Sequence, residues 1–258
     1  FKKDSSKVTA WFDDKGICTA CRYAELKEHY IDWDEREKEL MKLCDRFRSK
    51  DGSYDCIVPG SGGKDSSFTS HILKKKFGMH PLTVTWAPHK YTDIGWKNFQ
   101  SWIHSGFDNI LITPNGVVHR LLTKLAFENL LHPFQPFVFG QRYAGLRIAQ
   151  KFKISLVFHG ESPFEYGSSS LKEAEAKGFD ESFFSFDGNL KNVYLGGVNV
   201  PELMSSHNIE LNDLQLYLPF TKSELKRFPL EYHFLGYYIK WDPQEIYYSA
   251  VDFSQFEA

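Results

Sequence analysis

A glycine- and serine-rich loop between an apolar run and a helical pattern is the most constraining feature of this sequence. In the segment YDCIVPGSGGKDSSFTSHIL (residues 54–73), the loop occupies positions 60–63. Glycines let a backbone approach a ligand closely, and consecutive backbone N–H groups form a nest for an anion. A helix that begins directly after the loop adds unpaired donors and the positive end of its dipole. Strand, loop and helix in this order therefore predict a phosphate-binding site.

The spacing of the loop differs from two common phosphate-binding motifs. A Walker A loop has its lysine directly before Ser or Thr, whereas Lys64 precedes Asp65, and the pattern is not G-x-G-x-x-G either. Residues 61–66, SGGKDS, instead resemble the loop of PP-loop enzymes, the ATP pyrophosphatases that cleave ATP to AMP and pyrophosphate. The alternative is a glycine-rich turn that caps a helix. The resemblance implies that ATP is bound by Ser61, Gly62, Gly63, Lys64, Asp65 and Ser66.

The segments around this loop predict the fold class. Residues 54–160 alternate apolar runs with helical patterns, which is typical of a parallel α/β sheet. We expect strands over 54–58, 81–86, 109–113 and 154–160, with helices over 65–77, 95–104, 115–131 and 136–152. The expected fold is a Rossmann-like, adenine nucleotide alpha-hydrolase-like PP-loop domain over 51–167. Residues 1–50 form a small element with a C-x-x-C pair and a charged helix, and residues 168–258 form an irregular and helical extension that completes the site.

Composition and charge argue against several classes of function. The chain has 31 Lys and Arg against 33 Asp and Glu, so we expect no chain-wide attraction to nucleic acid. No segment approaches the ~20 apolar residues of a membrane helix, so we expect no membrane insertion. Four cysteines are too few for a disulfide scaffold, which favours a reduced, cytoplasmic location.

Six further segments carry a more specific resemblance. FDDKGICTACRYAELKEHYIDWDEREKEL, VPGSGGKDSS, WAPHKYTDIGWKNF, GFDNILITPNG, FHGESPFEYG and FLGYYIKWDPQE together resemble the N-acetyl sugar amidotransferase family of bacterial surface-sugar and lipopolysaccharide O-antigen biosynthesis. The resemblance covers most of the chain and is weakest over 168–230. It implies a reaction in which ATP adenylates the oxygen of an N-acetyl group on a nucleotide-linked sugar. Ammonia then displaces AMP and leaves an acetamidino group.

The resemblance also implies roles for single residues. Asp65 and Glu161, which follow the first and fourth expected strands, would hold Mg²⁺, a cation that prefers oxygen ligands. The alternatives are a first-turn acid that favours the helix dipole and a lone exposed Glu. Trp86, at the end of the second strand, lies where PP-loop enzymes hold adenine, or is a core Trp. Lys240 would neutralise charge between the α-phosphate and pyrophosphate, or is a solvated surface lysine. We expect Asp65, Glu161 and Lys240 to be catalytic.

Four other residues are weaker candidates. Glu165 could join Glu161, and Asp242 could either orient Lys240 or cap the helix that starts at Pro243. Gln141 and Arg142 lie near the expected cleft. Arg142 could pair with a nucleotide-sugar phosphate in a bidentate manner or form a surface salt bridge.

Cys18 and Cys21 have the spacing of half a tetrahedral zinc site. Cys44 and Cys56 are too differently placed to pair with them. The resemblance implies a second C-x-x-C upstream of Phe1, so we expect a structural Zn²⁺ whose other ligands precede the chain. Two free thiols are the alternative.

The partners follow from what the reaction needs. Nothing in the sequence resembles a glutaminase, which needs a nucleophilic Cys with a His partner, so the resemblance implies a separate glutaminase subunit that supplies ammonia. Two other functions remain open. A tRNA-thiolating PP-loop enzyme would need a basic nucleic-acid face, which the charge balance disfavours. A non-catalytic nucleotide-binding module would have less need of Asp65, Glu161 and Lys240 together.

Overall fold

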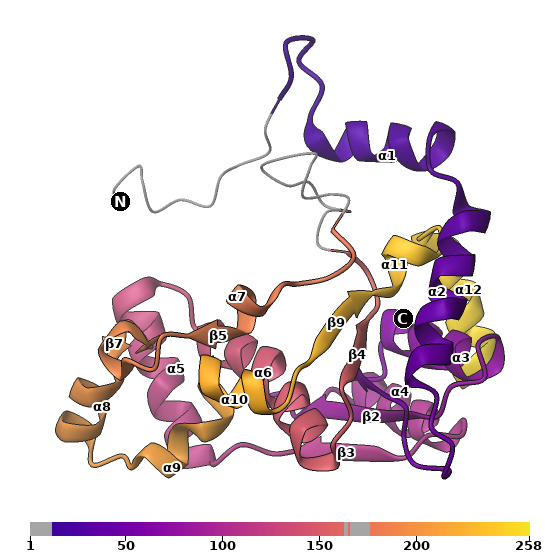
Figure 1. Cartoon of the computed structure of the whole chain (residues 1–258). Coiled ribbons are helices and arrows are strands. Elements are labelled where there is room, and N and C mark those ends of the chain that lie inside the picture. The colour runs from indigo at the N-terminus through magenta and orange to yellow at the C-terminus, as the bar shows by residue number, and fades with distance from the viewer. Residues whose placement is uncertain (1–11, 163–164, 166–175) are drawn as a thin grey trace.

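The computed structural model describes residues 12–162, 165 and 176–258, and a five-stranded parallel sheet forms its centre (Figure 1). The strand order is β3-β2-β1-β4-β9, and every neighbouring pair is parallel. The α/β class with a parallel sheet, expected from the sequence, is confirmed. The strands are β1 (Cys56–Pro59), β2 (Pro81–Trp86), β3 (Asn109–Ile112), β4 (Leu156–His159) and β9 (Glu231–Phe234).

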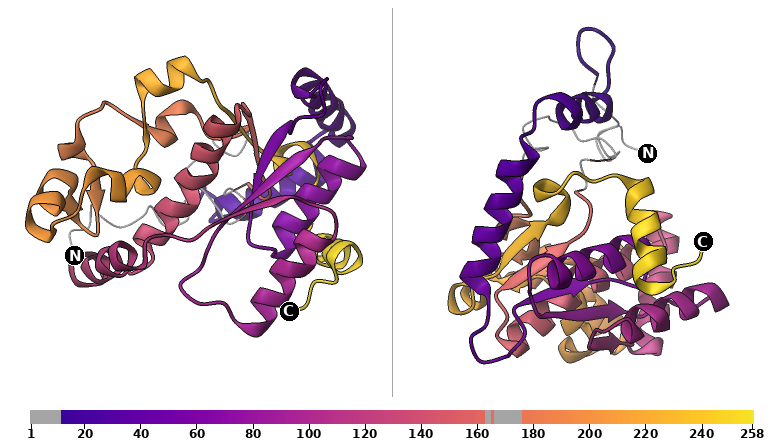
Figure 2. Two further views of the ribbon diagram at one scale, coloured as in Figure 1. Left: turned by 90° about the horizontal axis from the view of Figure 1, so that it is seen from below. Right: turned by 90° about the vertical axis from the view of Figure 1, so that its right-hand side faces the viewer.

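Helices cover both faces of the sheet (Figure 2). Successive side chains along each strand point to opposite faces, so neighbouring residues join different hydrophobic clusters. Ile57 and Val157 point to one face and pack against α6 (Gln135–Phe152). Val58 and Phe158 point to the other face. The helices on that face are α2 (Trp33–Phe47), α3 (Lys64–Lys75), α4 (Asp93–His104), α11 (Leu235–Tyr238) and α12 (Pro243–Ser254).

The fifth strand is a correction to the irregular and helical structure expected over 168–258. β9 lies beside β4, with Tyr232 opposite Val157, and α12 packs along α3 through a hydrogen bond between Ser254 Oγ and Ser67 Oγ at 2.8 Å. The sequence EYHF hides this strand because it alternates polar and aromatic residues at the edge of a sheet, where only Phe234 is fully buried. The C-terminal region therefore contributes to the central sheet and to its helical cover.

A second hydrophobic cluster lies beside the sheet, at the left of Figure 1. It joins α5 (Gly116–Leu130), the hairpin β6 (Tyr194–Leu195)–β7 (Val198–Asn199), α8 (Val200–His207) and α9 (Leu211–Leu214) to α6. The remaining elements are α1 (Thr19–His29), α7 (Glu181–Phe184), β5 (Ser185–Phe186), which pairs with β8 (Phe220–Thr221), α10 (Lys222–Arg227) and two 3₁₀ turns at Leu190–Asn192 and Gln215–Tyr217.

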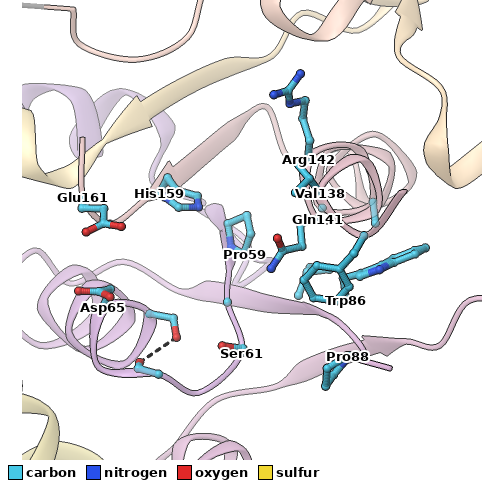
Figure 3. Close-up of a pocket in the computed structure, with 18 of the residues that line it drawn as sticks. Pro59, Ser61, Asp65, Trp86, Pro88, Val138, Gln141, Arg142, His159 and Glu161 are labelled. Carbon is cyan, nitrogen blue, oxygen red and sulfur yellow. Dashed lines mark hydrogen bonds between the residues drawn. The ribbon is translucent and has the colours of Figure 1, made fainter. Parts of the chain in front are cut away.

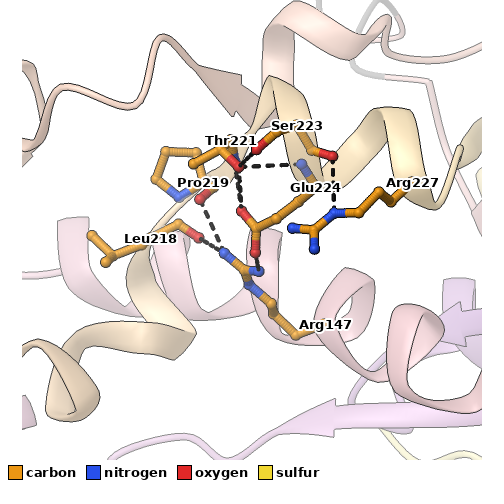
Figure 4. A network of polar contacts seen from close by, with 7 residues as sticks. All are labelled: Arg147, Leu218, Pro219, Thr221, Ser223, Glu224 and Arg227. Atoms are coloured by element: carbon orange, nitrogen blue, oxygen red, sulfur yellow. Dashed lines mark hydrogen bonds and ion pairs between the residues drawn. The ribbon is translucent and has the colours of Figure 1, made fainter.

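Arg147 links α6 to the segment 218–224 (Figure 4). From α6, its guanidinium binds the Glu224 carboxylate at 2.7 Å and donates to the Pro219 carbonyl oxygen at 3.0 Å and the Leu218 carbonyl oxygen at 3.4 Å. It also lies 3.9 Å from the centre of the Phe220 ring. In the described part of the chain, no helix combines the length and the apolar character needed to span a membrane.

Candidate active site

The strand order places a crevice between the ends of β1 and β4. β2 lies on one side of β1 and β4 lies on the other, so the loops that follow β1 and β4 run in opposite directions. In open α/β sheets, ligands bind in the crevice outside the carboxyl ends of the strands at such a switch point. A cavity of about 700 Å³ opens there, lined by the loop after β1, residues 159–161 after β4, the end of β2 and one side of α6 (Figure 3).

The two central glycines of the loop have different structural requirements. Gly62 has a φ of +84°, and a Cβ there would lie 2.6 Å from the Cα of Phe99 on α4, so both conformation and space require glycine. Gly63 has a φ of −69°, and a Cβ would meet only Ser61 Oγ at 3.8 Å. The fold therefore does not require glycine at position 63. Gly63 lines the cavity, and a ligand that approaches its backbone closely would require glycine there.

Gly63 is also the N-cap of α3, and among the described side chains none caps this helix. The first N–H groups of a helix have no partner within it, and they favour an anion. Ser66 Oγ donates to the Gly63 carbonyl oxygen at 3.0 Å, so this hydroxyl helps to fix the turn. The start of α3 thus presents uncapped donors to the cavity, which fits a phosphate.

Most of the loop residues predicted to bind ATP line the cavity. Ser61, Gly63, Asp65 and Ser66 do so. Gly62 faces α4 instead, and Lys64 Nζ forms an ion pair with Asp65 Oδ1 at 2.5 Å. The roles of these residues in binding remain predictions.

Asp65 and Glu161 both line the cavity, and Figure 3 shows their carboxylates one above the other on its left side. They come from α3 and from the segment after β4, so the two sides of the switch point each supply one acid. Two carboxylates beside uncapped backbone donors fit a Mg²⁺ ion bound with phosphate oxygens. The donor set of the cavity therefore fits the predicted cation.

His159, the last residue of β4, was not predicted from the sequence. Its ring reaches the cavity and stacks on Tyr232 with ring centres 6.2 Å apart. Desolvation lowers the pKa of His159, and the nearby Asp65 carboxylate opposes this shift only in part. His159 directly precedes Gly160 and Glu161, so the argument that selected Glu161 at the strand end could also have found it.

Trp86 is a core residue that also borders the cavity, and its role at adenine remains a prediction. It lines the cavity at the end of β2, yet only 5 % of it is exposed, and its ring contacts Tyr217 and His119 in the core. A Cβ on Gly140 of α6 would lie 2.2 Å from Trp86 Cε2, so a glycine is needed where the helix crosses this ring. No pattern in the sequence indicates Gly140, because the requirement for glycine there arises from a contact between distant segments.

Three C-terminal and loop candidates do not line the cavity. Lys240 Nζ donates to Glu28 Oε2 at 2.9 Å on the surface. Asp242 caps α12 by accepting from two backbone N–H groups, which is its structural interpretation. Glu165 forms an ion pair with Lys27, and burial raises the pKa of Glu165. In contrast, Gln141 and Arg142 both line the cavity from α6.

The cysteine pair lies apart from the cavity. Cys18 is the N-cap of α1, and its Sγ accepts from the backbone N–H of Cys21 at 3.5 Å. Within residues 12–162, 165 and 176–258, no group of three or more His, Cys, Asp or Glu side chains could hold a metal ion. Zinc binding by this pair therefore stays a prediction. Cys44 and Cys56 are buried, and burial raises the pKa of both thiols.

Comparison with known proteins gives distant similarities. No protein-family model matches the sequence. An uncharacterized protein of Methanocaldococcus jannaschii, MJ1599, is 32 % identical over 73 residues, which span 28 % of this chain and 26 % of that protein. The chain thus matches about a quarter of the length of this relative.

Several solved structures resemble the chain at low sequence identity. The NMN synthetase of Francisella tularensis has a TM-score of 0.39 and 14 % identity over 88 % of each chain. The NAD⁺ synthetase of Burkholderia pseudomallei has a TM-score of 0.37 and 12 % identity, over 92 % of this chain and 94 % of that one. A predicted tRNA methyltransferase subunit of Methanocaldococcus jannaschii has a TM-score of 0.35 and 15 % identity, over 76 % of this chain and 74 % of that one.

Proposed function

We propose that this protein is an ATP-dependent, AMP-forming amidotransferase of the PP-loop type. It converts the N-acetyl group of a nucleotide-linked sugar into an acetamidino group in bacterial surface glycan biosynthesis. The observation that carries the nucleotide part is the uncapped start of α3, where Gly63 opens to the cavity beside Asp65 and Glu161. The sugar part rests on the sequence segments that resemble N-acetyl sugar amidotransferases.

The chemistry explains why ATP is needed. An amide carbonyl carbon is a poor electrophile, because the nitrogen lone pair donates into the carbonyl, and its oxygen is a poor leaving group. The amide oxygen attacks the α-phosphorus of ATP, an O–P bond forms, and the bond to pyrophosphate breaks. Ammonia then adds to the activated carbon, one proton is lost, and AMP departs with the original amide oxygen. The site supplies positioning and stabilisation of phosphate charge.

The residues of the cavity divide the work in this proposal. The backbone at Gly63 and the hydroxyls of Ser61 and Ser66 bind pyrophosphate. Asp65 and Glu161 would hold Mg²⁺, which neutralises phosphate charge when bound. Trp86 borders the adenine. The role of Lys240 at the α-phosphate rests on the resemblance alone, because its side chain pairs with Glu28 on the surface.

The ammonia source in this proposal is a separate glutaminase subunit. Glutaminase chemistry needs a reactive thiolate with a His partner, and burial disfavours the thiolate of Cys44 and Cys56 by raising the pKa of each. Turnover with ammonium but not with glutamine alone supports a separate subunit, whereas glutamine-dependent turnover by the isolated chain contradicts it. A cytoplasmic location, where thiols stay reduced, belongs to the same proposal.

The direct test is product analysis of the full chain with ATP, Mg²⁺, ammonium and a panel of UDP- and CMP-linked N-acetyl sugars. The proposal predicts AMP, pyrophosphate and a sugar in which one oxygen is replaced by NH, identified by mass. Asp65→Asn should abolish AMP formation, while the matched control Asp93→Asn, on the surface at the start of α4, should not. ADP and phosphate as products would refute the assignment of the loop.

A further inference from the structure

The cavity has a second side that the nucleotide proposal does not use. Beyond β4, three aromatic side chains line it: Phe179, Phe183 and Tyr232, called here the aromatic wall. The Phe179 and Tyr232 rings lie 5.3 Å apart, and Phe179 stacks on Phe183. The wall lies on the β9 side of the sheet, whereas the loop after β1 and Trp86 lie on the β2 side. The cavity is therefore divided into a phosphate side and an aromatic side.

Arg142 brings a positive charge to the aromatic side. Its guanidinium carbon lies 4.0 Å from the centre of the Phe183 ring, within reach of a cation–π contact. Figure 3 shows the side chain extending from α6 away from Ser61 and Pro88. No carboxylate of the described residues forms an ion pair with it. A half-buried guanidinium with no anion among the described side chains is typical of a site that receives one from a ligand.

Arg147, on the same helix, shows what a structural arginine looks like here. It binds a carboxylate and two carbonyl oxygens and lies over an aromatic ring (Figure 4). Arg142 has the ring contact but lacks the oxygen partners among the described residues. The difference indicates that the fold fixes Arg142 through aromatic contacts and leaves its hydrogen-bond donors for a ligand.

The charges of the cavity assign this ligand to a separate place from ATP. In the proposed function, the uncapped donors of α3 and the Mg²⁺ that Asp65 and Glu161 would hold serve the phosphates of ATP, on the left side of Figure 3. Arg142 lies apart from these groups, at the wall. An aromatic wall beside a guanidinium suits a molecule that presents an apolar ring surface and an anionic group.

We propose that the aromatic wall and Arg142 form the subsite for the acceptor, and that the acceptor is a sugar that carries a phosphate group. The C–H face of the sugar ring stacks on the wall, and its phosphate pairs with Arg142 in a bidentate manner. This inference rests on the proposed function, because it takes the acceptor to be a sugar. It places the acceptor across β4 from the bound nucleotide.

Calorimetric titration of the full chain tests this subsite with defined probes. N-acetylglucosamine 1-phosphate should bind about 10- to 100-fold more tightly than N-acetylglucosamine, as expected for charge-assisted hydrogen bonds. Arg142→Gln should remove this preference, whereas Lys151→Gln, which removes an exposed charge from the same helix, should keep it. Phe183→Leu should weaken binding of both sugars by a similar factor.

The outcomes separate the subsite from the proposed function. An ATP analogue with a methylene group between the α- and β-phosphorus should bind the wild type and Arg142→Gln equally. Lost affinity for this analogue in Arg142→Gln would overturn the inference, because Arg142 would then serve the nucleotide. An unchanged sugar preference in Arg142→Gln, or no sugar binding by the wild type at millimolar concentration, would also overturn it. If the wild type fails to bind the analogue, the proposed function fails instead.

Discussion

Alanine at the two neighbouring glycines of the loop should separate a structural requirement from a functional one. At position 63, the backbone conformation suits alanine, and a Cβ would come no closer than 3.8 Å to another group. Alanine lowers the conformational entropy of the unfolded chain, which stabilises the fold. It is also a poorer N-cap residue than glycine, which destabilises the fold. Both effects are small. We therefore expect Gly63→Ala to change the free energy of unfolding by less than about 1 kcal/mol.

Gly63→Ala should nevertheless weaken ATP binding, because its methyl group enters the space where phosphate must approach the start of α3. Loss of one or two charge-assisted hydrogen bonds predicts an affinity about 10- to 100-fold lower. Calorimetric titration with the methylene analogue of ATP measures this change.

Gly62→Ala should instead lower the stability of the fold itself. A positive φ costs alanine about 1–3 kcal/mol. The Cβ would lie 2.6 Å from backbone of α4, which cannot rotate away, and overpacking adds about 1–3 kcal/mol. Urea denaturation should thus show a loss of about 2–6 kcal/mol for this variant. The reasoning is refuted if Gly63→Ala binds the analogue as the wild type does, or if Gly62→Ala is as stable as the wild type.

Three further predictions concern the scaffold. Gly140→Ala should displace Trp86 and lower the unfolding free energy by about 1–3 kcal/mol, seen in urea denaturation together with a change in tryptophan fluorescence. Burial lowers the pKa of His71 to about 4 from 6.5, so the unfolded state takes up a proton first as pH falls. Stability should therefore be constant above about pH 6.5 and decline toward pH 4, by about 2 kcal/mol at pH 5 from this group alone. His71→Phe should show a shallower decline in urea midpoint between pH 7.5 and pH 5, and an identical decline would contradict this account. Arg147→Met should lower the thermal midpoint and cost about 2–3 kcal/mol, because it leaves Glu224 without its cation; an unchanged midpoint would show that this ion pair does not stabilise the fold.

Short-range patterns in the sequence predicted the elements around the start of α3 and the end of β4. The apolar runs before Gly60 and Gly160 marked two neighbouring strands, and the rule for strand ends then placed Asp65 and Glu161 at one edge. The absence of a capping side chain at position 63 is also visible in the sequence, since glycine offers no cap oxygen. Local patterns were sufficient there because strand, loop and helix are contiguous.

The aromatic side could not be predicted in the same way. Phe183 and Tyr232 are far apart in the chain, and β9 lacks the apolar run of a buried strand. The sequence predicts Arg142 as a candidate, but only the structure shows that it has no oxygen partner among the described residues, in contrast to Arg147. Lys240 shows the converse, because its motif indicated a catalytic role while its side chain pairs with Glu28 on the surface. Contacts between distant segments decide these cases, and a sequence pattern does not contain them.

The central claim is that ATP activates the acceptor oxygen by adenylation. An acceptor labelled with oxygen-18 in its acetamido carbonyl, incubated with the full chain, ATP, Mg²⁺ and ammonium, tests this claim most directly. The account predicts that the label appears in the phosphate of AMP, because the amide oxygen leaves with the adenylate. Label that remains in the sugar, or that appears in inorganic phosphate, would contradict it.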